Sequence, residues 1–158
     1  MIAFNIKLIS IQLGGFMPIN NVIHGSNFQY IEPINLYDCE FEDNVFIGPF
    51  VEIQSDVKIG SDTRVQSHSF ICSQVEIGNN CFIGHGVMFV NDKFSNGEAN
   101  FEAPFEKTNI GNNVLIGSNS TILPVEICDN VVIGAGAVVT KDINEAGVYV
   151  GNPVKKIK

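Results

Sequence analysis

The sequence predicts an all-β chain that winds as a parallel β-helix of hexapeptide repeats with one protruding loop. Aliphatic or aromatic anchors recur at every sixth position over more than forty residues: Ile47, Ile53, Ile59, Val65, Ile71, Ile77, Ile83 and Phe89. A period of six is a multiple of two but not of 3.6, so it permits strands and excludes a helix. Three hexads, about eighteen residues, complete one coil, and successive coils stack roughly 4.8 Å apart.

The residues around each anchor support this interpretation. Glycine follows the anchor at four corners, where the absence of a Cβ permits unusual dihedral angles: Gly48, Gly60, Gly78 and Gly84. Small or β-branched residues stand two positions before each anchor: Val45, Val51, Val57, Thr63, Ser69, Val75, Cys81 and Val87. Such side chains suit a tightly packed strand or corner, so we expect aliphatic columns to form the core.

The period begins at Phe41 and resumes after an interruption at Ile110, Ile116, Ile122, Ile127, Ile133 and Val139. It fails at Asn35, between Ile34 and Leu36, so the register shifts there or the regular coil has not yet begun. The spacing of five between Ile122 and Ile127 indicates a trimmed corner. Residues 90–109 have no clean period, and we expect them to leave the prism as a loop. Long loops in compact repeats usually carry function.

Length and composition predict one domain, residues 1–158, in which residues 1–28 are an N-terminal extension of uncertain role. Only 16% of the residues are charged, and a prism of this kind exposes flat apolar faces, so we expect self-association. The net charge of −8 argues against a nucleic-acid partner. Four of the nine basic residues nevertheless lie near the C-terminus: Lys141, Lys155, Lys156 and Lys158. They indicate either a site for a phosphorylated ligand or a solvated basic tail.

The cysteines and the N-terminal residues indicate in which cellular compartment the protein is expected. Cys39, Cys72, Cys81 and Cys128 have neither zinc-finger spacing nor a CxxC pair, so we interpret all four as reduced packing residues. Residues 1–17 are apolar, but no basic region precedes them and no convincing cleavage site follows. We therefore expect a cytoplasmic protein with no membrane partner.

His85 is the candidate catalytic residue. It follows a corner glycine just before the loop, so we expect its imidazole to point outward, where it can accept a proton from an attacking amine or hydroxyl. The alternative is a surface histidine with no role. His68, close to one coil earlier, is a candidate substrate contact or simply another corner residue. Asn91 and Asp92 open the loop and are candidates to bind a sugar or to orient His85, although Asn-Asp also serves merely to turn a chain.

Four segments carry a family resemblance: IGHGVMFVNDKF, IGNNVLIGSNSTILP, VVIGAGAVVTKDI and GNPVKKIK. With the hexads, they make residues 41–158 resemble the left-handed β-helix acyltransferases of the hexapeptide-repeat superfamily. Within these, the segment around residues 85–94 is similar to nucleotide-sugar N-acetyltransferases acting on dTDP-3-amino-3,6-dideoxyhexoses. The resemblance implies left-handed coiling, a homotrimer, acetyl-CoA as co-substrate in the groove between neighbouring prisms, a nucleotide sugar near the loop, and no metal.

The resemblance also implies roles for small residues and lysines. The matching motifs place Gly117, Ser118, Gly134 and Ala135 along the pantetheine arm, where small side chains let the cofactor approach the backbone. Lys141 and the cluster of Lys155, Lys156 and Lys158 would then face the CoA phosphates, and the GNP segment at 151–153, with Pro153, would shape the adenine end. Individually these glycines are weak evidence, because every corner of the repeat favours one.

These observations lead to one hypothesis and two alternatives. The hypothesis is N-acetylation of a nucleotide-linked amino sugar for surface-polysaccharide precursors, with His85 as the base. The first alternative is O-acetylation of a sugar or another small hydroxylated acceptor. The second is a non-enzymatic scaffold, or a metal-binding β-helix similar to γ-carbonic anhydrase, which would require several histidines at coil-related positions across subunits.

Overall fold

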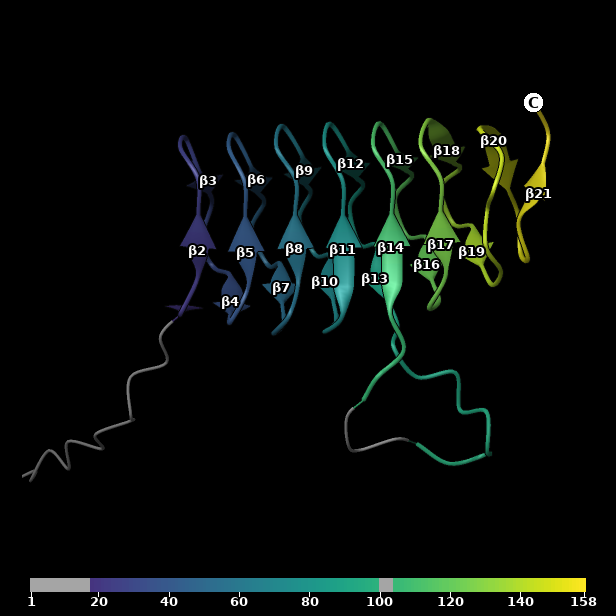
Figure 1. Cartoon of the computed structure of the whole chain (residues 1–158), viewed down its shortest axis with the longest axis horizontal. Coiled ribbons are helices and arrows are strands. Elements are labelled where there is room, and N and C mark those ends of the chain that lie inside the picture. Colours follow the sequence, from purple (N-terminus) through teal and green to yellow (C-terminus); the bar gives the residue numbers. More distant parts are fainter. Residues whose placement is uncertain (1–17, 100–103) are drawn as a thin grey trace, which may run out of the picture.

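The computed structural model describes residues 18–99 and 104–158, and in these residues every regular element is a strand. The strands stack coil upon coil into a prism with three sheets, which are parallel except for the last pair, β20 and β21 (Figure 1). This all-strand solenoid confirms the predicted parallel β-helix and is consistent with left-handed coiling. Residues 1–17, which carry most of the expected N-terminal extension, lie outside the described residues.

The three sheets are named face A, face B and face C. Face A is made of β1 (Ile19–Asn20), β4 (Asn35–Tyr37), β7 (Glu52–Ile53), β10 (Phe70–Ile71), β13 (Met88–Phe89), β16 (Thr121–Ile122) and β19 (Val138–Val139). Face B is made of β2 (Ile23–His24), β5 (Glu40–Phe41), β8 (Lys58–Ile59), β11 (Val75–Ile77), β14 (Thr108–Ile110) and β17 (Glu126–Ile127). Face C is made of β3 (Gln29–Tyr30), β6 (Phe46–Ile47), β9 (Arg64–Val65), β12 (Phe82–Ile83), β15 (Leu115–Ile116), β18 (Val131–Ile133), β20 (Gly147–Val150) and β21 (Lys155–Lys156).

The predicted anchors form the core. All eight anchors from Ile47 to Phe89 are buried, and identical positions of successive coils pair in register, as Ile83 does with Val65 and Ile116. The small residues two positions earlier are buried as well. Two of them are polar, and each bonds a backbone carbonyl: Thr63 Oγ1 donates to Gly78 O at 2.9 Å, and Ser69 Oγ donates to Gly84 O at 2.8 Å.

The glycines after the anchors are required for a different reason from the one that the sequence suggested. Gly48, Gly60, Gly78 and Gly84 do not adopt a positive φ. Instead, a Cβ at any of them would lie 2.5–2.8 Å from an atom of the next coil. The glycines therefore permit close stacking of coils, and the left-handed conformation falls two residues later in each corner.

The irregular regions of the period are explained by the register. At Asn35 the register shifts by one residue, so Leu36 is fully buried and pairs with Ile53. A coil is already present before it, because β1, β2 and β3 pair with β4, β5 and β6. The trimmed corner before Ile127 keeps Val125 in the core.

The protruding loop runs from residue 90 to residue 107, two residues shorter than expected, because β14 begins at Thr108. It leaves the prism at the edge between faces A and B, below β13 and β14 in Figure 1. Residues 100–103 of this loop lie outside the described residues. The described ends are joined by an ion pair between Lys93 Nζ and Glu106 Oε2 at 2.6 Å.

Candidate functional site

His85 lies on the edge between faces C and A, between β12 and β13. We call this the His85 edge; it consists of residues 48–51, 66–69, 84–87, 117–120 and 134–137. The backbone of the next coil lies so close to Gly84 that a Cβ there would be 2.7 Å from both Ile116 O and Ser118 N. The side chain of His85 is exposed, which agrees with its expected outward orientation.

Ser67 is the side chain that orients the imidazole. Its Oγ lies 2.8 Å from His85 Nδ1, and the two atoms share a hydrogen bond. On the other side, the backbone N–H of His85 donates to Ser118 Oγ at 3.2 Å. The sequence analysis missed Ser67, although the eighteen-residue coil places it one coil before His85. Because Nδ1 is engaged by Ser67, Nε2 is the nitrogen left for chemistry.

The residues expected along the pantetheine arm lie on the same edge as His85. Gly117 and Ser118 occupy the positions of Gly84 and His85 one coil later, and Gly134 and Ala135 occupy them two coils later. We call these four the small-residue row. Coil packing alone requires two of them, since a Cβ at Gly117 would meet Ala135 N and a Cβ at Gly134 would lie 2.7 Å from Val150 Cγ1. The row nevertheless places no side chain larger than that of serine at these four positions.

His68 shares the edge but not the position of His85. The structure places Ser67, not His68, at the position of His85 one coil earlier, and His68 corresponds to Gly86. Both His68 and Gly86 have positive φ, 64° and 65°. The ring of His68 stacks on Phe50 of the preceding coil, with centroids 4.8 Å apart.

Asn91 and Asp92 lie at the far end of face A, beyond β13, and do not orient His85. Asn91 Nδ2 donates to Ser73 Oγ at 3.0 Å, and the N–H of Phe94 donates to Asp92 Oδ1 at 2.8 Å. Both contacts help to turn the chain into the loop, which is the local role that the sequence left open. Asp92 also borders a polar hollow within the loop, together with Ser95, Asn96 and Glu106.

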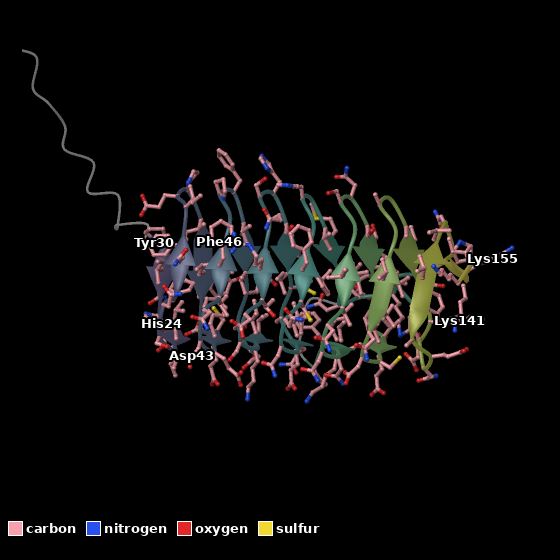
Figure 2. The ribbon with its side chains drawn as sticks, turned by 90° about the horizontal axis from the view of Figure 1, so that it is seen from above. His24, Tyr30, Asp43, Phe46, Lys141 and Lys155 are labelled. Atoms are coloured by element: carbon pink, nitrogen blue, oxygen red, sulfur yellow. The ribbon has the colours of Figure 1, made fainter. Side chains whose placement is uncertain are left out.

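The expected phosphate and adenine contacts lie at the C-terminal end of the prism. Lys141 and Pro153 line one pocket of about 230 Å³, together with Tyr149. Figure 2 shows Lys141 and Lys155 at this end, far from His24 and Tyr30 at the other. Lys156 pairs with Glu145 at 2.6 Å, whereas no ion pair is formed by Lys141 or Lys155 with the described residues.

The cysteines behave as packing residues. All four are free thiols, and three of them, Cys39, Cys72 and Cys81, are buried. Burial raises the pKa of Cys39 and of Cys72 to about 12 and also raises the pKa of Cys81, so these thiols stay protonated at neutral pH. Within residues 18–99 and 104–158 of a single chain, no three His, Cys, Asp or Glu side chains gather as a metal-binding group. The same described residues contain no helix able to span a membrane.

Comparisons with known proteins match this architecture. Residues 38–73 match the family described as bacterial transferase hexapeptide (six repeats), and residues 74–88 and 107–141 match the hexapeptide repeat of succinyl-transferase. The bifunctional protein GlmU of Streptococcus uberis is 35% identical over 120 residues, which are 75% of this chain. The chain spans only 24% of that relative's length.

Two solved structures extend the likeness. AntD, an N-acyltransferase from Bacillus cereus solved with dTDP and coenzyme A, is 22% identical with a TM-score of 0.68, over 87% of this chain and 83% of AntD. At that identity the likeness shows the fold alone. A maltose O-acetyltransferase from Clostridium difficile is 28% identical with a TM-score of 0.55, over 89% of this chain and 70% of that one. With its repeats matched from residue 38 to residue 141 around the loop, the chain belongs to the hexapeptide-repeat family of bacterial transferases.

Proposed function

We propose that the protein is an acetyl-CoA-dependent N-acetyltransferase acting in the cytoplasm on a nucleotide-linked amino sugar, of the dTDP-3-amino-3,6-dideoxyhexose type, for surface-polysaccharide precursors. The observation that carries the proposal is the His85 edge, where an imidazole oriented by Ser67 stands at the end of the small-residue row. AntD, which shares the fold, was solved with dTDP and coenzyme A, and the proposal takes a nucleotide-linked acceptor and a CoA donor by analogy with it.

The donor lies along the row in this proposal. Gly117, Ser118, Gly134 and Ala135 line the pantetheine arm, and the CoA phosphates face Lys141 and Lys155 at the C-terminal end. Pro153 borders the adenine end. This arrangement brings the thioester carbonyl next to His85, because the row and His85 share one line of equivalent corner positions.

The chemistry is acyl transfer. The amine nitrogen attacks the thioester carbonyl, a C–N bond forms, and backbone N–H groups of the groove stabilise the oxyanion. When Nδ1 carries the hydrogen and donates it to Ser67 Oγ, Nε2 holds a lone pair and takes the proton from the amine. The C–S bond then breaks, and the departing sulfur receives that proton, which yields the amide and CoA.

The site requires a neighbouring copy of the chain. Strand β13 separates His85 from Asn91, which lie at opposite edges of face A. In this proposal, one sugar ring therefore meets both only when a second prism brings its loop to the His85 edge. We propose a homotrimer in which the loop of one chain, with Asn91 and Asp92, positions the sugar at the His85 edge of the next.

The faces that flank the His85 edge suit such an assembly. The outward residues of face C include Phe46, Phe82 and Leu115, and those of face A include Phe70 and Met88. Phe82, Leu115 and Met88 are 39%, 45% and 44% exposed, which is high for large apolar side chains. Face B instead carries the polar row Glu40, Lys58, Glu76, Asn109 and Glu126.

The proposal is tested by acetyl-CoA turnover. Purified protein is incubated with acetyl-CoA and with amino or hydroxy sugars linked to dTDP or UDP, and free CoA thiol is followed. We expect turnover with the amino sugars and loss of the free amine in the product. Turnover of hydroxy sugars alone would instead establish the O-acetyltransferase alternative, which the likeness to maltose O-acetyltransferase favours. Bound zinc with no CoA binding would favour the metal-binding alternative.

His85 is tested by substitution. His85→Ala is expected to lower kcat by about 10²–10⁴ and to remove one limb of the pH–rate profile, because the general base is lost. Ser67→Ala is expected to lower kcat by less, since the imidazole remains but is no longer held by the hydrogen bond with Ser67. His24→Ala is the matched control, because His24 is an exposed histidine at the N-terminal end of the prism, on another edge from His85 (Figure 2). Near-complete activity of His85→Ala with an unchanged pH profile would show that the base assignment is wrong.

A further inference from the structure

The His85 edge carries an aromatic pair on the side away from the small-residue row. Phe50 and His68 occupy equivalent positions in successive coils, and their rings stack with centroids 4.8 Å apart and an interplanar angle of 29°. Phe50 is 58% exposed, so a large part of its surface is open to a further flat ring. No part of the chemistry described above uses this pair.

The backbone at this pair is costly for such side chains. Phe50 and His68 have φ values of 59° and 64°, a region that large L side chains rarely adopt. The same chain fills the equivalent corner between faces B and C with short polar residues that tolerate this conformation: Asn27, Asn44, Asp62, Asn80, Asn113 and Asn130. Further along the His85 edge itself, Gly86, Asn119 and Gly136 occupy the same position. Phe50 is more than half exposed, so burial offsets little of the cost of this backbone conformation, and local folding does not explain the choice of Phe.

The position of the pair along the edge indicates its ligand. The donor row runs from His85 towards the C-terminus, so an acceptor must reach His85 from the N-terminal side, where Ser67, His68 and Phe50 lie. Phe50 is two coils from the level of His85, which is about 10 Å at the strand spacing of a sheet. In a nucleotide-linked sugar, the base is separated from the reacting amine by a ribose and two phosphates.

We propose that Phe50 and His68 form a stacking platform for the base of the acceptor nucleotide, an inference that rests on the function proposed above. Aromatic side chains bind bases through their faces, so the platform holds the nucleotide without reading its hydrogen-bonding edge. The platform therefore accepts a pyrimidine or a purine. Selection of the sugar is left to the groups around His85.

The experiment measures nucleotide binding, which does not depend on catalysis. Isothermal titration of the trimer with dTDP, UDP and GDP is compared between the wild type, Phe50→Asn and Phe50→Tyr. Asn tolerates the positive φ, so Phe50→Asn is expected to keep or raise the melting temperature. Its affinity for dTDP is expected to fall by roughly 5- to 100-fold through the lost stacking. Phe50→Tyr keeps the ring and is expected to bind like the wild type.

Steady-state kinetics distinguish a role in binding the nucleotide from a role in binding acetyl-CoA or in catalysis. In Phe50→Asn, the KM for the amino-sugar nucleotide is expected to rise, while the KM for acetyl-CoA and the kcat stay near those of the wild type. Ile23→Asn is the control: Ile23 is 64% exposed on face B, and its replacement is expected to change neither binding nor turnover. An affinity for dTDP within twofold of the wild type in Phe50→Asn would overturn the platform. So would dissociation of the trimer by Phe50→Asn, because Phe50 would then be an interface residue.

The two proposals fail in different ways. If the wild type acetylates no amino-sugar nucleotide, the proposed function fails, whatever Phe50 does. If the wild type acetylates them and Phe50→Asn matches its dTDP affinity and KM, only the platform fails.

Discussion

Asp43 shows how single polar side chains fasten the corners of this prism. It lies on the edge between faces B and C, near the N-terminal end (Figure 2). Its Oδ1 accepts the N–H of Ser26 at 2.6 Å and the Ser26 hydroxyl at 2.9 Å, so it binds the first coil to the second. Both bonds lower the pKa of the Asp43 carboxyl below its ordinary value, and the bond from the Ser26 backbone has the larger effect.

This lowered pKa predicts a dependence of stability on pH. A carboxyl whose pKa is lower in the folded state stabilises the fold above its unfolded pKa of about 3.9 and loses that effect as pH falls through the folded value. Asp43→Asn is therefore expected to unfold more easily than the wild type at pH 7. The difference in denaturant midpoint is expected to shrink as the pH is lowered below 4. A midpoint difference that stays the same from pH 7 to pH 3 would contradict this role.

The same edge contains a ladder that the sequence analysis did not anticipate. Asn27, Asn44, Asp62, Asn80, Asn113 and Asn130 share one corner position, with φ between 54° and 62°. Four of the five neighbouring pairs are hydrogen-bonded through their side chains, as from Asn80 Nδ2 to Asn113 Oδ1 at 2.8 Å. A signal was present, because Asn or Asp stands three residues after an anchor in several hexads. The sequence interpretation considered the anchors and the glycines that directly follow them, and did not consider the position three residues after the anchor.

At each corner, the close contact between successive coils limits the size of the residue that follows the anchor. At Gly60, a Cβ would lie 2.5 Å from Asn79 Oδ1 and 2.7 Å from Gly78 C. The second of these is backbone and is fixed by the pairing of β8 with β11. Gly60→Ala must therefore push two coils apart.

Gly60→Ala is expected to destabilise the fold by about 1–3 kcal/mol, the usual cost of overpacking. Gly97→Ala is the matched control. Gly97 lies in the loop with φ of 77° and no atom within 4 Å of an added Cβ, so it tests backbone strain without a clash. Its effect on global unfolding is expected to be about 1 kcal/mol or less. The measurement is denaturant unfolding followed by circular dichroism, and equal stability of Gly60→Ala and the wild type would refute the close-stacking argument.

For the elements as a whole, the sequence was most informative where one physical requirement repeats. Inward aliphatic residues must recur every six positions to fill the prism, so the strands, the trimmed corner and the loop were predictable from spacing. The position of His85 on an edge followed from the same period, whereas its alignment with Ser118 and Ala135 was found only in the structure. Ser67 and Phe50 were missed because the corner side chains follow no pattern of residue type, although the regular eighteen-residue coil places Ser67 beside His85 and Phe50 beside His68.

Across the described coils, the outward residues are mainly apolar on face C, mixed on face A and mainly polar on face B, and this asymmetry bears on the proposed homotrimer. Arg64, the one arginine of the sequence, lies on face C with its guanidinium 4.2 Å from the centroid of the Phe46 ring. Phe82 and Leu115 continue the same outward row, in register with Arg64 and with each other. A single chain exposes this row to water, whereas a neighbouring copy would cover it.

Leu115→Lys therefore tests whether face C is an interface. A charge placed among Phe82 and Val132 would be desolvated in a trimer, so light scattering is expected to show the wild type as a trimer and Leu115→Lys as a smaller species. Acetyl transfer is expected to be lost with the trimer, because His85 and Asp92 then belong to separate molecules. Asn109→Lys is the matched control: the same charge stands on face B between Glu76 and Glu126, where it is attracted, and it is expected to leave mass and activity unchanged. If Leu115→Lys stays trimeric, face C is not the interface. If it is a monomer with full activity, the site does not need a neighbouring copy, and the loop and His85 act within one prism.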